Sequence, residues 1–519
     1  MAVESHAARI QSSDQGLDNT KARILVRGFN VRGIPVYPEA GITEAKIDKF
    51  LASYLQQHGK KSRYTVNELH MAADELTRLY RVAGFIFHRA YIPAQEVKNQ
   101  RVRIRVRTGV LSSVNVFQQD NYSAQLIQEA FSHLVGMPVE QLAIEQAMYK
   151  LNALPGLQVF GYFSSGSRPD ETRLNLRVIE DDDFIARLSI DNYGAETTGL
   201  YRANLNASWI NPFGLADTFQ FGLMQSYDPQ NSLYGYVQYR VPFFNYTTDW
   251  YINYSNSSYE LGKQFEALLL IGSSHNTRTG FNFKPIFSSS GHWAFNTEYY
   301  LHSSDLKSDF SQQLDQKNTI TRLQLQTDYL FRGQSFWTSG KLGGRQSTAK
   351  PSVGDQQNHS YQYASLGFGW NFKNAWLPDW KLQAHHQAAE EALGSIDKFL
   401  LTGLQRVRGT ESGYLSVDTG TTAHAELSWG GPKFRFFIFS DMGEGKKLKE
   451  KSADKATIPK FNLASSGIGA TWRISKSWNA KLQAANISQA EQTLNSEKTE
   501  LSVKGDTYVM AELSYQVRL

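Results

Sequence analysis

The hydrophobic and polar positions of this chain follow two different periods, and the change falls near residue 183. Before that point, apolar residues recur with the spacing of an α-helix. One helix face is predicted within residues 43–59, formed by Ile47, Phe50, Leu51, Tyr54 and Leu55. A second helix is predicted to begin after Thr65, where Glu68 completes a capping box, and to end at Gly84.

Short β-like runs flank this helix pair, and the same order of elements then returns. The first set of runs covers 23–31, 85–92 and 101–107. The second set reads as a strand at 109–117, helices at 124–134 and 140–154, and strands at 157–163 and 172–180. We therefore predict two tandem β-α-α-β-β units, over residues 23–108 and 109–182. An unrelated α+β pair is the alternative interpretation.

Beyond residue 183 the apolar residues alternate with polar ones. In 201–209 the odd positions are apolar and the even positions are polar, and 322–331 and 509–519 show the same pattern. Repeated segments of this kind, roughly ten residues long and separated by polar turns, are typical of a transmembrane β-barrel. A soluble β-sandwich also alternates, but over residues 183–519 it would need several domains with linkers, and no linker is visible.

Two further features favour the barrel. Tyrosine and tryptophan gather near predicted strand ends, as in 247–254 and 291–300, which suits the aromatic girdles at a membrane surface. The alternation also continues to the last residue, as expected where the final strand pairs with the first. At about 21 residues per strand and turn, the segment is long enough for roughly 16 antiparallel strands.

Composition narrows the function classes. The net charge of +5 gives no reason to expect nucleic-acid binding. The absence of cysteine excludes disulfides, thiolate metal sites and a cysteine nucleophile, and it fits an oxidising envelope. The first residues lack the apolar core of a signal peptide, so we expect either a cytosolic chain or a mature chain with an added methionine. No run of about 18 apolar residues occurs, which excludes a membrane helix but leaves a barrel open.

Catalytic motifs are missing from the sequence. It contains no Gly-x-Ser-x-Gly elbow, no His-Glu-x-x-His and no phosphate-binding loop. His385 and His386 are adjacent, and adjacent strand residues face opposite sides, so they are not expected to share a metal. We therefore expect no enzymatic activity, no cofactor and no metal. A passive porin or adhesin barrel remains as an alternative, although it has no use for two small tandem units. An outer-membrane enzyme, the other alternative, would need inward acid, serine or histidine groups within hydrogen-bond distance of one another.

Several local stretches carry a family resemblance. They are "LSIDNYGAETTGLYR" with "NPFGLAD" (188–202 and 211–217), "FNVRG" (29–33), "GVLSSVNV" (109–116), "RVRG" (406–409) and "FIFSDMG" (437–443). With the tandem units and the barrel, they resemble the two-partner secretion transporters, or TpsB proteins, of Gram-negative outer membranes. These are relatives of BamA, and their small units are POTRA domains. The resemblance runs from about residue 23 to residue 519.

The resemblance implies a function. It implies an outer-membrane translocase with periplasmic POTRA domains, which exports a large exoprotein without nucleotide hydrolysis. The partner would be a haemolysin, an adhesin or a contact-dependent toxin, recognised through its N-terminal secretion domain, and its identity is left open. The barrel is expected to be a monomer in contact with lipid and lipopolysaccharide, the latter at the lysine-rich stretch 446–455.

The resemblance also implies a site. The stretch "RVRG" is similar to the tip of a long extracellular loop that folds back into the lumen, here placed at about 403–415 with Val407, Arg408 and Gly409 at its tip. The register of 437–443 sets two phenylalanines and an aspartate on one face, and the rings would break the polar-in rule of a barrel unless a loop covers them. An arginine in the lumen favours a carboxylate that accepts two hydrogen bonds. The predicted latch pair is Arg408 with Asp441, and the predicted lumen-packing residues are Phe437, Phe439, Gly443, Gly467 and Gly469. Gly467 and Gly469, two apart on a following strand, are expected to leave bare backbone that gives the loop room.

Some points stay open at this stage. Arg408 in a solvated external loop is the alternative to the latch. Thr410 stands where the family usually has an aromatic residue, which puts the packing of the tip in question. Residues 1–22 are polar and are predicted to form at most a short helix, and whether it plugs the pore is undecided.

Overall fold

The computed structural model describes residues 9–10, 23–58, 62–228, 231–243, 247–262, 271–287, 291–308, 311–331, 336–351, 356–372, 377–449 and 458–519. The chain divides into two compact units. The first comprises Met1–Ala153 with Leu157–Glu180, and the second comprises Leu154–Gly156 with Asp181–Leu519. The predicted plug helix falls in residues 1–22, which lie outside the described residues apart from the short strand β1 (Arg9–Ile10).

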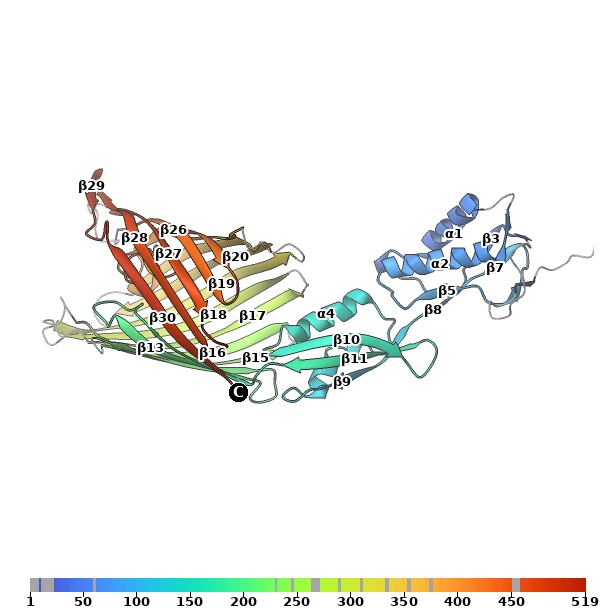
Figure 1. Cartoon of the computed structure of the whole chain (residues 1–519), viewed down its shortest axis with the longest axis horizontal. Coiled ribbons are helices and arrows are strands. Elements are labelled where there is room, and N and C mark those ends of the chain that lie inside the picture. The colour runs from blue at the N-terminus through green and yellow to red at the C-terminus, as the bar shows by residue number, and fades with distance from the viewer. Residues whose placement is uncertain are drawn as a thin grey trace, which may run out of the picture. The chain divides into compact units, whose positions relative to one another are not determined.

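The N-terminal part of the first unit packs two helices against short strands (Figure 1). Its main elements are β3 (Gly28–Asn30), α1 (Glu44–His58), α2 (Val66–Val82), β5 (Arg89–Tyr91), β7 (Arg101–Arg103) and β8 (Arg105–Arg107). The smaller strands β2 (Ile24–Leu25), β4 (Arg63–Tyr64) and β6 (Gln95–Glu96) pair as β2–β4 and β1–β6. The capping box is present: Thr65 Oγ1 accepts from Glu68 N, and Glu68 Oε2 accepts from Thr65 N.

The predicted strand at 85–92 is shorter in the structure. Only Arg89–Tyr91 is extended, because the residues before it close the end of α2. Phe85 N donates to Tyr80 O, and His88 N donates to Phe85 O, so residues 85–88 form turns instead.

The rest of the first unit repeats the order strand, two helices, two strands. It consists of β9 (Val110–Phe117), α3 (Ala124–Glu129), η2 (Ser132–Leu134), α4 (Gln141–Asn152), β10 (Leu157–Ser165) and β11 (Glu171–Glu180). The sheet order is β10-β11-β9, with β11 parallel to β9 and antiparallel to β10. The predicted helix at 124–134 is divided into α3 and the 3-10 turn η2.

The second unit is an antiparallel β-barrel. Its sixteen long strands in the described residues are β12 (Phe184–Asp191), β13 (Tyr201–Ile210), β14 (Thr218–Tyr227), β15 (Ser232–Phe243), β16 (Thr248–Glu260), β17 (Ile271–Phe287), β18 (Gly291–Ser308), β19 (Ser311–Phe331), β20 (Phe336–Pro351), β21 (Gln357–Trp370), β22 (Asp379–Ala389), β25 (Thr419–Gly430), β26 (Phe434–Lys446), β27 (Lys460–Arg473), β28 (Trp478–Leu494) and β30 (Thr507–Arg518). The short β29 (Glu497–Glu500) extends the pairing of β28.

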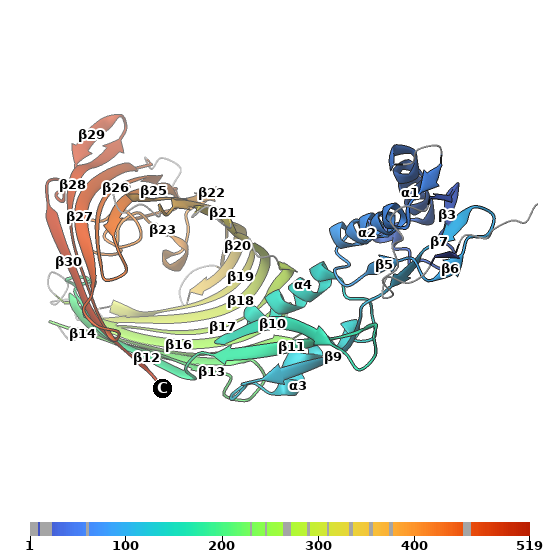
Figure 2. The ribbon, with the colours of Figure 1, turned by 45° about the vertical axis from the view of Figure 1, so that its right-hand side comes forward.

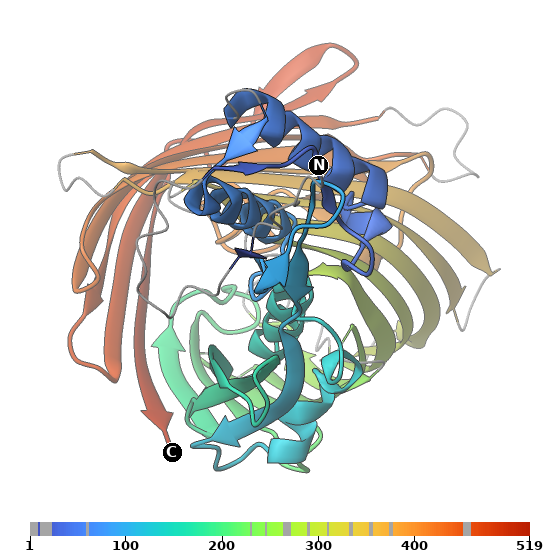
Figure 3. The same cartoon turned by 90° about the vertical axis from the view of Figure 1, so that its right-hand side faces the viewer.

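The first and last strands close the barrel. β12 pairs with β30 from Ile185 opposite Arg518 to Asp191 opposite Glu512. Figure 3 shows the strands curving around an interior. The predicted fold class, small α+β units followed by an antiparallel barrel of about 16 strands, is confirmed.

The alternation along each strand divides its side chains between two surfaces. On β12, Leu188 and Ile190 are exposed on the outer surface, whereas Arg187 pairs with Glu512 of β30 on the inner one. This is the apolar-out, polar-in arrangement that a barrel surrounded by lipid requires. No helix in the described part of the chain has the length and apolar character needed to cross a membrane.

Residues 390–418 connect β22 to β25, and we call them the inner loop. They contain η4 (Ser395–Asp397) and the paired strands β23 (Phe399–Leu400) and β24 (Ser416–Val417). This segment lies within the ring of barrel strands (Figure 2). Its apolar residues pack with Phe461, Leu463, Ile487 and Ala490 of β27 and β28.

Candidate functional site

The inner face of β26 departs from the usual polar lining of a barrel. Phe437, Phe439 and Asp441 are all buried, with exposed fractions of 3%, 5% and 1%. Ile438 and Met442, at alternate positions of the same strand, are exposed on the outer surface. Strand alternation therefore places the aspartate and the two rings on the same inner face, where the inner loop covers them.

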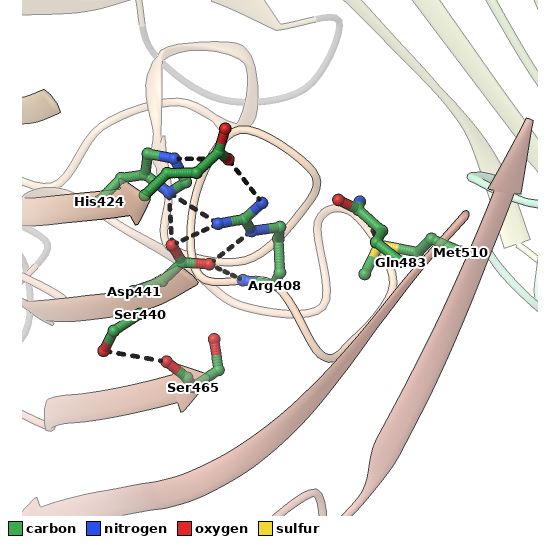
Figure 4. Close-up of polar contacts among 8 residues, drawn as sticks. Arg408, His424, Ser440, Asp441, Ser465, Gln483 and Met510 are labelled. Carbon is green, nitrogen blue, oxygen red and sulfur yellow. Dashed lines mark hydrogen bonds and ion pairs between the residues drawn. The ribbon is translucent and has the colours of Figure 1, made fainter. Parts of the chain in front are cut away.

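Arg408, in the inner loop, is bound to Asp441 by three hydrogen bonds (Figure 4). Its Nε donates to Asp441 Oδ2 at 2.8 Å and its Nη2 donates to Oδ1 at 3.0 Å. Its backbone N–H also donates to Oδ2, at 3.1 Å. The guanidinium thus holds the carboxylate in the two-pronged geometry that suits arginine, and the backbone contact fixes the loop itself.

Two residues of β25 complete the charge cluster. His424 lies directly across the sheet from Asp441, and its Nδ1 is 2.5 Å from Asp441 Oδ1. The other ring nitrogen, Nε2, is 3.5 Å from Glu426 Oε2, and Arg408 Nη1 is 3.7 Å from that same oxygen. The cluster therefore places two carboxylates around one guanidinium, with the imidazole of His424 in contact with both carboxylates and with Arg408.

Sequence reasoning did not identify His424 and Glu426. A signal for them was present, because they alternate with alanine and leucine in "AHAEL" (423–427), which places both on one face of a strand next to Asp441. Only the pairing of β25 with β26 shows that this face is the inner one.

The two phenylalanines pack beside the charge cluster on the inner face of β26. The guanidinium carbon of Arg408 lies 3.2 Å from the centroid of the Phe439 ring, a cation–π contact. Phe437 and Phe439 are the cross-strand partners of Gly469 and Gly467 on β27. A Cβ at either glycine would lie within 2.4 Å of a phenylalanine ring atom. The space left by these two glycines therefore holds the rings, and not the loop as we expected.

Gly443 is one of the glycines that make room for the loop, and it does so at the tip. A Cβ there would lie 2.8 Å from Val407 Cγ2. Val407 is fully buried, in one apolar cluster with Leu401 and Ile487. The loop tip thus lies directly against bare backbone of β26.

The tip conformation requires a glycine at position 409. Gly409 has φ of +116°, and a Cβ on it would lie 2.7 Å from Ile487 Cγ1. The next residue, Thr410, is 7% exposed, and its hydroxyl donates to Glu411 O. A cavity of about 340 Å³ lies beside Thr410, lined in part by Tyr193, Tyr508 and Met510.

Taken together, these contacts fasten a loop and do not form a reaction centre. No group of three or more potential metal ligands occurs in the described residues. The charged groups are directed at one another, and Arg408 and Asp441 are nearly inaccessible to solvent, so the cluster holds the inner loop against β25 and β26.

Comparisons with known proteins give the family. The chain matches the family model of the haemolysin secretion/activation proteins ShlB/FhaC/HecB over residues 170–472, more than half of its length. It matches the model of the ShlB-type POTRA domain over residues 26–109.

Relatives and solved structures agree with these matches. The chain is 23% identical to the heme/hemopexin transporter protein HuxB of Haemophilus influenzae, over 78% of this chain and 74% of that protein. It is 23% identical to the outer membrane transporter CdiB of Escherichia coli, over 77% of this chain and 69% of that protein. The structure of CdiB from Escherichia coli superposes with a TM-score of 0.70 at 19% identity, covering 99% of this chain and 94% of that one. CdiB from Acinetobacter baumannii gives a TM-score of 0.68 at 16% identity, with the same coverage.

The predicted resemblance to TpsB transporters is therefore confirmed, and with it the class of function. The molecule is an outer-membrane transporter for an exoprotein, with its POTRA region in the periplasm, and it is not an enzyme. The chain belongs to the ShlB/FhaC/HecB family of haemolysin secretion/activation proteins.

Proposed function

We propose that the two units 23–108 and 109–182 both act as POTRA domains, which capture the N-terminal secretion domain of a large exoprotein. The barrel of residues 183–519 then passes this exoprotein to the cell surface. The observation that carries the proposal is the inner loop, fastened inside the barrel by the buried pair Arg408–Asp441. A passive porin or adhesin barrel has no need of a fastened loop that must leave for a chain to pass.

The first unit offers a place for an extended chain. A groove of about 980 Å³ runs between α1 and β3, lined by Phe29, Asn30, Asp48 and Leu51 among others. In the described residues β3 pairs with β7 alone, so its other edge is unpaired. An incoming strand could pair with that edge through backbone hydrogen bonds, which demand little of its sequence.

The pair Arg408–Asp441 acts in this proposal as a latch. While it is intact, the inner loop occupies the lumen, and its release opens the route. No nucleotide is required, because folding of the partner outside the cell would make its movement irreversible.

The partner is proposed to be a haemolysin, an adhesin or a contact-dependent toxin. The name of the family model supports the first of these. We further propose that the barrel is a monomer that contacts lipid and lipopolysaccharide. In support, its closed sheet leaves no long strand edge free for another copy in the described residues. The stretch 446–455 proposed for lipopolysaccharide lies largely outside the described residues.

Residues 23–182, produced alone, test the proposal. We expect a soluble α+β protein that binds the N-terminal region of an exoprotein encoded beside this transporter, with micromolar or weaker affinity. Titration calorimetry measures the affinity, and the C-terminal region of the same exoprotein is the control ligand. Absence of binding by a fragment that is folded, while the full transporter still secretes that exoprotein, would contradict the proposed recognition.

A further inference from the structure

The inner loop contacts the barrel wall at a second place, far from the cluster around Arg408 in the order of strands. Asp397, in η4, is 3% exposed, and its Oδ1 lies 3.0 Å from Nε of Arg345 on β20. Among the ion pairs of the described residues, Arg345 is the only cation that contacts this carboxylate. A buried carboxylate without a partner destabilises the folded protein, so this ion pair helps to fix the position of the inner loop.

Arg345 is held in place by the wall. Its Nη1 donates to the hydroxyl of Tyr361 at 3.1 Å. The guanidinium carbon lies 5.7 Å from the ring centroid of Tyr300 and 5.8 Å from that of Tyr361. Side chains of β18 and β21, which are not part of the inner loop, thus hold the arginine beside Asp397.

The pairs Arg345–Asp397 and Arg408–Asp441 are separate, and the loop contributes the opposite charge to each of them. In the order of the sheet, β21, β22 and β25 lie between β20 and β26. At the tip the loop supplies the cation, Arg408, whereas near its start it supplies the anion, Asp397. The start of the loop is further tied by Gln387, whose Nε2 donates to the backbone oxygen of Asp397 at 2.9 Å.

We propose that Arg345 is a second positioning residue for the inner loop, which holds the loop's first arm (residues 390–398) to β20 through an ion pair separate from the one at the tip. The loop therefore leaves the lumen in two steps. When the pair Arg408–Asp441 opens, the tip moves while the first arm stays on β20, and the arm is freed only when the pair Arg345–Asp397 also separates. This inference concerns how the loop is attached and does not depend on the proposed role of Arg408 in transport.

A spin label on the first arm tests the proposal in the full-length protein. The chain has no cysteine, so Ser395→Cys, an exposed position in η4, gives a single labelling site. In the otherwise unchanged protein we expect an immobile nitroxide spectrum. Arg345→Gln is expected to shift the spectrum to its mobile component, whereas Arg408→Ala should leave it immobile.

The barrel supplies a matched control. Arg322 on β19 lies directly across from Arg345, but its carboxylate partner is Glu298 of the neighbouring wall strand, at 2.6 Å. Arg322→Gln removes the same charge from the same region without touching the loop, so the label should stay immobile. Heat-modifiable migration on gels shows that each variant barrel is folded.

Exchange of the two charges completes the test. The double variant Arg345→Asp with Asp397→Arg restores an ion pair and should return the label to its immobile spectrum. An immobile label in Arg345→Gln would overturn the proposal. An equal shift in Arg322→Gln would overturn it as well, because it would show a general effect of lumenal charge.

Discussion

At the scale of single residues, Arg408 and Asp441 depend on each other. Both are almost completely buried, and each satisfies the other's charge. Removal of one leaves a buried charge without its main partner, which costs on the order of 3–5 kcal/mol for a well-buried pair. Removal of both avoids that cost, because the two act as one unit.

This gives the first prediction. Arg408→Ala and Asp441→Ala should each reduce secretion of the partner while the barrel still inserts in the membrane. The double variant should be little worse than either single one. Secreted partner and heat-modifiable barrel are measured for all three. Full secretion by Arg408→Ala at normal barrel levels would show that Arg408 is an ordinary loop residue and not part of a latch.

A second residue-scale prediction concerns His88 in the first unit. His88 is fully buried, and its Nε2 is 2.8 Å from the hydroxyl of Tyr37. Burial lowers the pKa of His88 from 6.5 to about 4. Because the folded pKa lies below the unfolded value, the contribution to stability is complete above pH 6.5 and is lost as the pH falls towards 4.

We therefore expect the fragment 23–182 to lose up to about 3 kcal/mol of unfolding free energy over that interval, since one pKa unit corresponds to about 1.4 kcal/mol. Urea unfolding at a series of pH values measures the loss. We expect His88→Phe to be less stable at neutral pH. Its unfolding free energy should change less with pH across the same interval. If the unfolding free energy of His88→Phe changes with pH as much as that of the unchanged fragment, the pH dependence comes from other groups.

At the scale of elements, the inner loop is shaped by glycines with different tasks. Gly409 combines a positive φ with a close approach to Ile487. Gly413 also has a positive φ (+83°), but a Cβ added there would meet no atom within 4 Å. Both positions disfavour alanine through backbone strain, but only position 409 adds a clash with the wall.

The third prediction uses this pair. Gly409→Ala should loosen the tip markedly, while Gly413→Ala, with the same kind of strain but open space around it, should have a small effect. Limited proteolysis of the loop in detergent-solubilised protein measures the difference. Equal cleavage of the two variants would show that contact with Ile487 does not hold the tip.

The elements also show what a sequence alone reveals. Alternation predicted the barrel, and the capping box at Thr65 predicted the start of α2, because both depend on local patterns. The strand number followed from the length of the alternating segment. His424, Glu426 and the pair Arg345–Asp397 could not be predicted in the same way. Their positions depend on which strands become neighbours and on where the inner loop folds back, and these are long-range outcomes.

At the scale of the whole barrel, the inner loop determines how open the lumen is. The fourth prediction is that deletion of residues within 403–415 increases conductance, because it removes the tip that packs on β26, β27 and β28. Planar-bilayer recordings of the purified protein measure the change. A deletion of similar length in 449–457, part of the connection between β26 and β27, is the control, because it leaves the contacts of Lys446 and Leu448 with Asp418 of the inner loop in place. Conductance unchanged by the first deletion would mean that the loop does not obstruct the channel.

The strand lengths of the barrel have a consequence for what leaves it. β12 has 8 residues, whereas β18 has 18 and β19 has 21. Roughly 9–11 residues suffice to cross a membrane as a tilted strand. Counted from the periplasmic start of β12, the β18–β19 hairpin has its connection at the cell surface, so its surplus length stands above the lipid there. The rim of the barrel is therefore uneven: it is lowest at β12, β13 and β14, and higher on either side, at β18–β19 and at β28 with β29. An emerging polypeptide should therefore be least enclosed over β12 to β14, and its first folded turns should form there.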